Sequence, residues 1–439
     1  MMLASIGARD VEALFAAIPK ALRLSRPLDL PEPLPEWELS RHMQALAAKN
    51  ATTRTHNSFL GGGAYDHYIP AVVDAIVSRG EFLTSYTPYQ PEISQGLLQA
   101  LFEYQTALSA ITGLPVVNGS CYDGATALAD AAWCTCLISG TQAEGGIVLS
   151  EGVWPHWREV VNSYMGGRGV GIQALPLDKK SGRIDVKALD AALAKHKSAG
   201  FLFQTPNSVG VFEDVKAIAD ICAKHGVTSV CAFNPLAAGI VTPPGLQGVD
   251  IVVCDGQPLG IPLSAGGPSL GVFATRREYR KYVPGRLIGK VTDINGNLAY
   301  ALVYEDREQH VARERATSNI CSNQALNALR AVIYLASLGE GGLSKIAALN
   351  ARKAHYLAEK LSSIGVEQAF DGAFFNEFVV VLSKPVAPIL KTLQENKIFG
   401  GIDYSGALGL KHALLISVTE TKTRADMDAF AHGLKKTLA

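Results

Sequence analysis

The sequence predicts an α/β protein with a mostly parallel sheet, helices on both faces, a smaller α/β domain at the carboxyl end and an arm at the amino end. From about residue 114, short apolar runs alternate with helical stretches, which is typical of parallel sheets. From residue 323, two long helical segments precede further strand-like runs, which indicates a second domain. The prolines within residues 27–35 remove backbone donors and prevent a continuous helix, so this part should be extended. We therefore expect an arm over residues 1–65, a large domain over 66–322 and a small domain over 323–439.

Apolar spacing and turn residues set the limits of the expected elements. One helix should begin after Pro91, because Glu92 lies in its first turn, and should end at Gly113. Helical spacing is also clear over residues 125–138 and 215–224. The expected strands of the large domain are residues 114–117, 146–149, 171–175, 200–204, 228–233 and 250–254. The small domain should contain helices over 323–337 and 343–364 and strands over 378–382 and 414–418.

The composition excludes several classes of protein. The 439 residues are 48% hydrophobic, enough for one large core and a smaller one. Forty basic residues balance forty acidic ones, so we expect neither nucleic acid nor a membrane surface as a partner. The sequence has no long uninterrupted apolar run and no basic, apolar export signal, so we expect a cytoplasmic protein. Its seven cysteines form no C-x-x-C pair, which favours reduced core residues over metal ligands.

Residues 117–127 combine a strand end, a turn of small residues and the start of a helix. This arrangement places backbone N–H groups and the hydroxyl of Ser120 where a phosphate could bind. A capped helix packed closely on a sheet is an equally good interpretation. The segment lacks the lysine of a Walker loop, and residues 166–171 do not form a dinucleotide-binding glycine motif, so nucleotide-binding folds are not supported.

Two later strand ends carry side chains where a pyridoxal-phosphate enzyme contacts its cofactor. Trp154 and His156 follow a strand at the place of the ring that stacks on the cofactor. Asn234 ends another strand, where such enzymes place an aspartate against the pyridinium nitrogen. A neutral amide does not stabilise the protonated nitrogen as a carboxylate does, so this substitution weakens the electron-accepting character of the ring.

Gln257 stands at the next strand end, where the cofactor lysine is expected. The lone pair of an amide nitrogen is delocalised into its carbonyl group, so Gln257 cannot form the Schiff base. No lysine occurs between His225 and Arg280. We therefore interpret Ser120, His156, Asn234 and Gln257 as members of a vestigial cofactor site.

Three longer motifs resemble one family across nearly the whole chain. Residues 85–96 read SYTPYQPEISQG, residues 256–262 read GQPLGIP, and residues 315–321 read RATSNIC. They resemble the P-proteins of the glycine cleavage system, in the form whose α and β chains are separate. The resemblance implies the type I fold of pyridoxal-phosphate enzymes. It also implies that a lysine-free α chain such as this one pairs with a homologous β chain that carries the cofactor lysine.

The family resemblance implies a reaction as well. The assembled enzyme, glycine dehydrogenase (aminomethyl-transferring), decarboxylates glycine with pyridoxal 5'-phosphate held covalently by the β subunit. It then transfers the aminomethyl group to the lipoyl group of H-protein, whose disulfide accepts the electrons. Because the site of a type I enzyme lies across a subunit interface, a subunit without the lysine can still contribute residues to it.

Two loops are candidates for that contribution. Tyr86, Thr87 and Tyr89 offer hydroxyls and flat rings to glycine or the lipoyl arm, although the tyrosines could simply fill an interface. A second loop contains residues that could contact the phosphate of the partner's cofactor or cap the helix that follows. These residues are Thr317, Ser318 and Asn319.

Two alternatives to the α subunit remain open at this stage. The chain could be a self-sufficient lyase that uses another lysine such as Lys290, although that residue lies far beyond the strand end that addresses the cofactor. It could also be a structural or regulatory scaffold. Separately, the basic residues between Arg276 and Lys290 could guide H-protein toward the site, or they could form an ordinary solvated helix face.

Overall fold

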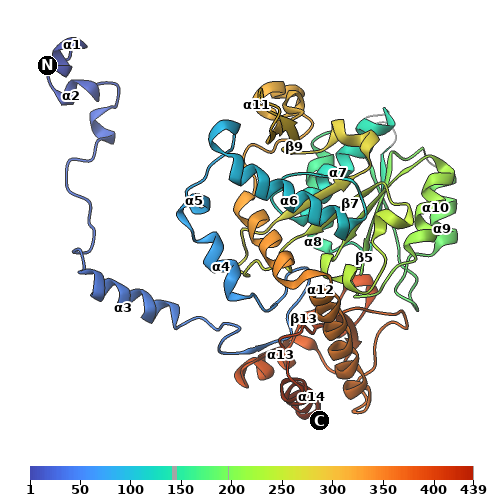
Figure 1. The fold of residues 1–439 in the computed structure, drawn as a ribbon. Helices are drawn as coiled ribbons and strands as arrows, with labels where there is room; N and C mark the ends of the chain where they lie inside the picture. Colours follow the sequence, from blue (N-terminus) through green and yellow to red (C-terminus); the bar gives the residue numbers. More distant parts are fainter. Residues whose placement is uncertain (141–145, 196, 439) are drawn as a thin grey trace. The chain divides into compact units, whose positions relative to one another are not determined.

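The computed structural model describes residues 1–140, 146–195 and 197–438, and the chain divides into two units, Met1–Thr52 and Thr53–Ala439 (Figure 1). The first unit contains no buried residue. In it, Asp10 caps α2 by accepting a hydrogen bond from the Ala13 N–H, and the proline-rich segment separates the short helices from α3. Its elements are α1 (Met2–Ser5), α2 (Val11–Leu14), η1 (Lys20–Leu22) and α3 (Glu36–Ala47).

The second unit is built on a seven-stranded sheet with the order β2-β8-β7-β6-β5-β3-β4. The strands β4, β3, β5, β6 and β7 are parallel, whereas β8 is antiparallel to both β7 and β2. All six strands expected in the large domain are present, with ends shifted by at most two residues. The strands are β2 (Val116–Val117), β3 (Ile147–Ser150), β4 (Ile172–Leu175), β5 (Gly200–Thr205), β6 (Thr228–Phe233), β7 (Ile251–Asp255) and β8 (Gly271–Thr275).

Helices pack against this sheet and connect its strands. The helix expected after Pro91 begins at Gln95, because Pro91–Ile93 form a 3-10 turn, and it ends at Gly113, which has a φ of 75°. The helix α7 is rich in alanine and is buried along most of its length, so it packs closely against β6, β7 and β8. The helices are α4 (Ala71–Val77), α5 (Gly80–Leu83), η2 (Pro91–Ile93), α6 (Gln95–Thr112), α7 (Gly124–Ser139), α8 (Pro155–Gly166), α9 (Val186–Lys195), α10 (Val215–His225), η3 (Pro235–Gly239) and η4 (Pro244–Gln247).

A β-hairpin follows the sheet, and the sequence analysis did not anticipate it. The strands β9 (Leu287–Thr292) and β10 (Leu298–Val303) pair antiparallel across a turn in which the Gly296 N–H donates to the Asp293 carbonyl. The Asn-Gly pair in that turn is a hairpin signal that could have identified it. Short helical turns flank the hairpin: η5 (Arg277–Tyr282), η6 (Glu305–Arg307), α11 (Gln309–Ala312) and η7 (Arg313–Arg315).

The carboxyl-terminal part forms its own layer, with a three-stranded antiparallel sheet of order β11-β14-β13. The expected strands over residues 378–382 and 414–418 correspond to β11 and β14. Phe59 lies in the core of this layer, and the neighbouring strand β1 (Asn57–Ser58) pairs with β12. The elements are α12 (Ala325–Ser362), β11 (Glu377–Val381), α13 (Val386–Glu395), β12 (Ile398–Phe399), β13 (Ile402–Asp403), η8 (Ala407–Gly409), β14 (Ala413–Ser417) and α14 (Arg424–Leu438).

The two long helical segments expected from residue 323 form α12, which is interrupted at Gly339 by a non-helical conformation (φ 61°, ψ −178°). Among the described helices, α12 alone is long and apolar enough, by length and composition, to cross a membrane. The part before Gly339 is shorter than the roughly 20 residues that a bilayer requires. The part after it carries Lys345, Arg352 and Lys353. Together with the packing of α12 on α4 and α6, this favours two helices that pack with one side against the rest of the fold.

Candidate functional site

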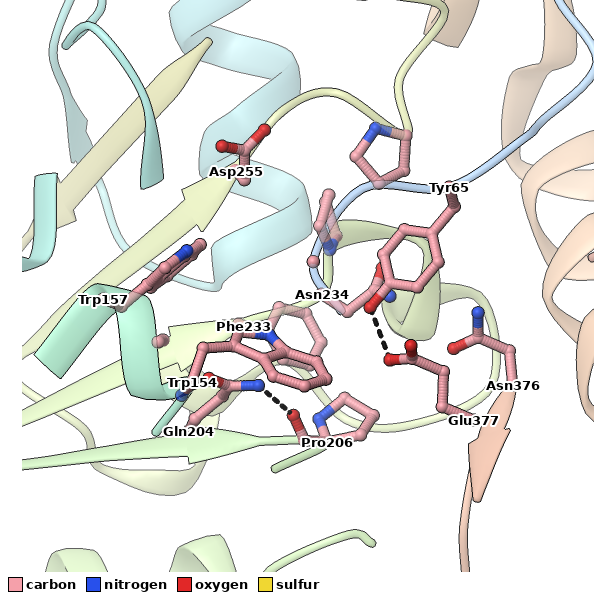
Figure 2. Close-up of a pocket in the computed structure, with 14 residues that line it drawn as sticks. Tyr65, Trp154, Trp157, Gln204, Pro206, Phe233, Asn234, Asp255, Asn376 and Glu377 are labelled. Carbon is pink, nitrogen blue, oxygen red and sulfur yellow. Dashed lines mark hydrogen bonds between the residues drawn. The ribbon is translucent and has the colours of Figure 1, made fainter. Parts of the chain in front are cut away.

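A pocket lies beyond the carboxyl ends of the parallel strands β5, β6 and β7, the usual position of a ligand site in an open α/β sheet (Figure 2). Asn234 and Asp255 come from the ends of β6 and β7, and Trp154 precedes α8. Tyr65 and Glu377, which sequence reasoning missed, close the opposite side of the pocket. The sheet thus brings Asn234 and Trp154 to one pocket, as the sequence analysis expected.

The Gln257 side chain serves as a structural tie at the end of β7. Its Oε1 atom accepts a hydrogen bond from the Tyr65 N–H at 2.8 Å. Its Nε2 atom donates to the carbonyl oxygens of Tyr65 at 2.9 Å and of Ile261 at 3.0 Å. The side chain is buried, with the whole residue only 5% exposed. The amide at the lysine position therefore fastens the segment around Tyr65 to the end of the sheet.

At the start of α7, where the sequence suggested a phosphate site, backbone N–H groups already donate hydrogen bonds to carboxylates of this chain. Asp123 caps the helix and accepts a hydrogen bond from the Thr126 N–H at 2.8 Å. Asp255 accepts hydrogen bonds from the N–H groups of Gly124 at 3.0 Å and Gln257 at 2.9 Å. Burial raises the pKa of Asp255 above its ordinary value. Two carboxylates at one helix start oppose the binding of a further anion by charge repulsion.

Ser120 and Asn234 also make local hydrogen bonds. The Ser120 Oγ accepts from the Gln324 N–H at 2.9 Å, which ties the loop before α7 to the start of α12. The Asn234 Oδ1 accepts from the Leu236 N–H at 3.1 Å and so caps the turn η3. Both residues therefore have structural partners within the chain.

The remaining wall of the pocket contains aromatic and amide groups. The backbone N–H of Trp154 donates to the Gln204 side-chain oxygen at 3.0 Å. The rings of Trp154 and His156 stack with their centroids 6.2 Å apart. Burial lowers the pKa of His156, so burial favours its neutral form. His156 itself contacts Trp154 and does not line the pocket.

Tyr65 and Glu377 form a buried pair across the pocket (Figure 2). The Tyr65 hydroxyl donates to one carboxylate oxygen of Glu377 at 2.7 Å, and the Gly62 N–H donates to the other at 2.7 Å. Burial raises the pKa of Glu377 to about 7. A Cβ atom on Gly61 would lie 2.0 Å from the Glu377 Oε1 atom, so the glycine cluster at residues 61–63 permits this close approach. That cluster is the sequence signal that could have indicated the pair.

The pocket of this chain does not fit pyridoxal phosphate. Its cavity volume is about 30 Å³, which is space for one or two water molecules. Pockets that bind molecules of cofactor size have volumes of roughly 300–1,000 Å³. Gln257 supplies no amine, and Asp123 and Asp255 already accept hydrogen bonds from the N–H groups at the start of α7. Within the described residues, no group of three or more His, Cys, Asp or Glu side chains is placed to bind a metal ion.

The loops that sequence analysis assigned to a shared interface meet at Arg286. The Arg286 Nη2 group donates to the Thr87 hydroxyl at 3.2 Å, the Tyr89 hydroxyl at 3.4 Å and the Cys321 carbonyl at 2.8 Å. Tyr86 lies in the same loop, is 79% exposed, and lines a second cavity together with Thr87 and Arg286. The structure therefore brings residues 86–89 and the end of the 315–321 motif together.

The three candidate phosphate-binding residues of that motif lie in different environments in the structure. The Ser318 hydroxyl is buried and donates to the carboxylate of Asp130. Thr317 is half-buried and Asn319 is exposed. The alternative that these residues cap α12 is wrong, because the residue at the N-cap is Gln324 and no side chain caps the helix there.

The basic residues between Arg276 and Lys290 do not form one helix face. Arg276 pairs with Asp250 at 3.0 Å, and the turn η5 ends at Tyr282. Arg286 is only 4% exposed. Lys290 lies in β9 against the Phe102 ring, outside the pocket at the strand ends.

Comparisons with known proteins agree on one family. The family model of the glycine cleavage system P-protein matches residues 1–434. A probable glycine dehydrogenase (decarboxylating) subunit 1 from Anoxybacillus flavithermus is 45% identical over 435 residues, which cover 99% of this chain and 96% of that protein. Its counterpart in Rhodospirillum centenum is 44% identical over 443 residues, covering 100% of this chain and 97% of the relative.

Solved structures confirm the predicted fold. A glycine decarboxylase (P-protein) of the glycine cleavage system, in inhibitor-bound form, has a TM-score of 0.89 and 38% identity, with 100% of this chain and 97% of that chain covered. A glutamate decarboxylase from Lactobacillus brevis has a TM-score of 0.73 at 13% identity, with 96% of each chain covered, and supports the fold alone. The fold is therefore that of type I pyridoxal-phosphate enzymes, and the chain belongs to the P-protein family of the glycine cleavage system.

Proposed function

We propose that this chain is the α subunit of a glycine decarboxylase and that it has no activity without a homologous, lysine-bearing β subunit. The hydrogen bonding of Gln257 is the observation that carries the proposal. An amide that is held by three backbone groups at the lysine position, beside a cavity too small for the cofactor, indicates a pocket with a structural role. The designation of the relatives as subunit 1 supports the existence of a second subunit.

The proposed complex decarboxylates glycine and transfers the aminomethyl group to the lipoyl disulfide of H-protein. Pyridoxal 5'-phosphate, held covalently by the β subunit, supplies the electron-accepting chemistry. The α subunit contributes surface residues of the loops that Arg286 joins. The exposed ring and hydroxyl of Tyr86 are suited to line a shared site, with Thr87 and Tyr89 oriented behind it by the guanidinium of Arg286. We place this complex in the cytoplasm.

The first experiment tests which subunit binds the cofactor. The chain is purified alone and in complex with its β partner, and each sample is incubated with pyridoxal phosphate. We expect an aldimine absorption band that borohydride removes in the complex and not in the chain alone. A borohydride-sensitive band in the chain alone would contradict the proposal, because it would identify a lysine of this chain as the cofactor ligand.

The second experiment tests the contribution of the loops. Tyr86→Phe and Thr317→Val are introduced into the complex, with Tyr68→Phe as a control that also removes an exposed tyrosine hydroxyl. We expect a loss of glycine decarboxylation of at least tenfold for one of the two loop variants and none for the control. Full activity in both loop variants would favour a subunit that acts only as a scaffold.

A further inference from the structure

A second cavity, separate from the pocket at the strand ends, lies between the loop of residues 82–88, helix α6 and the start of α12. Its volume is about 240 Å³, several times that of the first pocket. Apolar side chains, among them Phe82, Leu97 and Leu101, form one wall. Arg286 and the segment from Ser322 to Leu326 form the polar wall. The cavity therefore combines a restricted volume with donors on one side.

Arg286 is an unusual group to find in such a wall. It is 96% buried, its guanidinium lies 5.5 Å from the centroid of the Tyr89 ring, and Glu308 attracts it without forming an ion pair within 4 Å. Its Nη2 group is shared among three neutral oxygen atoms, and its buried Nε group has no hydrogen-bond partner. A buried guanidinium without a directly bonded carboxylate is costly, and an arginine fork fits a carboxylate or a phosphate closely.

The acids near Arg286 do not form an ion pair with it among the described residues. Arg307 is also buried and donates to the Val283 carbonyl, while its Nε and Nη2 groups have no partner. Glu308 is the buried acid of this region, and its closest basic contact is His310, at 3.9 Å. Glu308 attracts both Arg286 and Arg307, and Asp306 also attracts Arg307. An anion in the cavity would give the Arg286 guanidinium the direct ion pair that it lacks among the described residues.

The start of α12 supplies a second, independent set of donors. The Gln324 N–H is satisfied by Ser120, but no side chain caps the first turn. The residues Ala325 and Leu326, whose backbone N–H groups belong to that turn, line the cavity. The helical part up to Gly339 is long enough to give its amino-terminal end the partial positive charge of a helix dipole. Uncapped helix starts of this kind bind anions.

We propose that this cavity is a binding site for a small oxyanion, a carboxylate or a phosphate group, held between the Arg286 guanidinium and the first turn of α12. The donors select a negative charge, and the apolar wall limits the size of the ligand. Thr87 and Tyr86 border the same cavity, so the site adjoins the loops that we assign to the shared active site. Its role in catalysis rests on the proposed function, whereas anion binding by the chain does not.

Binding is tested first with the full chain alone. Inorganic phosphate and acetate are titrated calorimetrically at constant ionic strength, with chloride as the reference anion. We expect saturable binding of at least one of the two probes. The Arg286→Gln variant should weaken that binding at least tenfold, and Arg286→Lys should weaken it less because it keeps the charge. Arg277→Gln, which removes an exposed charge from the same basic segment, is the matched control and should bind as the wild type does.

Hydrogen exchange locates the bound anion in the wild-type chain, so this test does not depend on whether a variant folds. The bound probe should protect the amides of residues 322–329 and 82–88 and leave those of the pocket at the strand ends unchanged. The proposal is overturned if neither probe binds saturably. It is also overturned if binding protects other segments only, or if a folded Arg286→Gln chain binds as tightly as the wild type.

Kinetics of the assembled complex then identify the oxyanion. If the ligand is the carboxylate of glycine, Arg286→Gln raises the KM for glycine at least tenfold and leaves the affinity for pyridoxal phosphate unchanged. If the ligand is the phosphate of the partner's cofactor, the variant weakens cofactor binding instead. A complex that is inactive with the wild-type chain would refute the proposed function, while anion binding by the chain alone would still support this site.

Discussion

Replacement of Gln257 by leucine tests whether this residue is a structural tie. Leucine has a similar size but cannot form the three hydrogen bonds of the amide. The Tyr65 carbonyl retains a second donor, the His67 N–H at 3.2 Å, so two backbone groups lose their partners: the Tyr65 N–H and the Ile261 carbonyl. An unsatisfied buried polar group costs about 1–3 kcal/mol, so we expect a loss of roughly 2–6 kcal/mol in the free energy of unfolding.

Urea denaturation followed by circular dichroism measures this loss. The control is Gln99→Leu, which removes an exposed hydrogen bond to Glu103 and should change the free energy of unfolding by no more than about 0.5 kcal/mol. Hydrogen exchange should also show faster exchange of the amides in the segment around Tyr65, because Gln257 bonds to both the N–H and the carbonyl of Tyr65. A change equal to that of the control, with unaltered exchange in this segment, would refute the structural role of Gln257.

Two further predictions concern the same pocket. Gln257→Lys should give no aldimine absorption band with pyridoxal phosphate in the isolated chain, because the cavity is about 30 Å³ and Asp255 already accepts the Gly124 N–H at the start of α7. A band that borohydride removes would show that the missing amine was the only defect. Burial raises the pKa of Glu377 from 4.5 to about 7, so the folded chain binds more protons than the unfolded chain in this window and its stability falls as the pH rises through it. Because glutamine does not titrate, Glu377→Gln should remove up to about 3 kcal/mol of this pH-dependent loss in the free energy of unfolding. Urea denaturation of the wild type and the variant at pH 4.5, 6 and 8 measures the difference. The prediction is contradicted if the free energy of unfolding depends on pH in the same way in both proteins.

The fold was largely predictable because local patterns determine it. Alternating apolar and helical segments identified the parallel strands, and Gly113 correctly marked the end of α6. The antiparallel strand β8 was missed, because a short buried strand that follows a turn without an intervening helix departs from the alternation that identified the others. In the candidate site, the departures at Asn234 and Gln257 were visible because each lies directly at a strand end.

Other features of the site depend on contacts between residues that are far apart in the sequence. Tyr65 and Glu377 are separated by 312 positions, and no local pattern pairs them. Arg286 belongs to a basic segment that looked like an exposed surface, and its burial arises from packing against the loops of Thr87 and Cys321. Ser318 was predicted to contact the partner's cofactor, whereas its hydroxyl points into the protein and donates a hydrogen bond to the buried carboxylate of Asp130. Such assignments need the tertiary structure.

The tie formed by Gln257 also bears on how the proposed division of labour between subunits could persist over evolutionary time. A single nucleotide change converts a glutamine codon into a lysine codon, so an amine at this position is always one mutation away. In this chain, however, that change would release the backbone at Tyr65 and Ile261 before any cofactor could bind. The first step toward a cofactor-binding chain would therefore lower the stability of the fold, so the packing around Gln257 opposes that change.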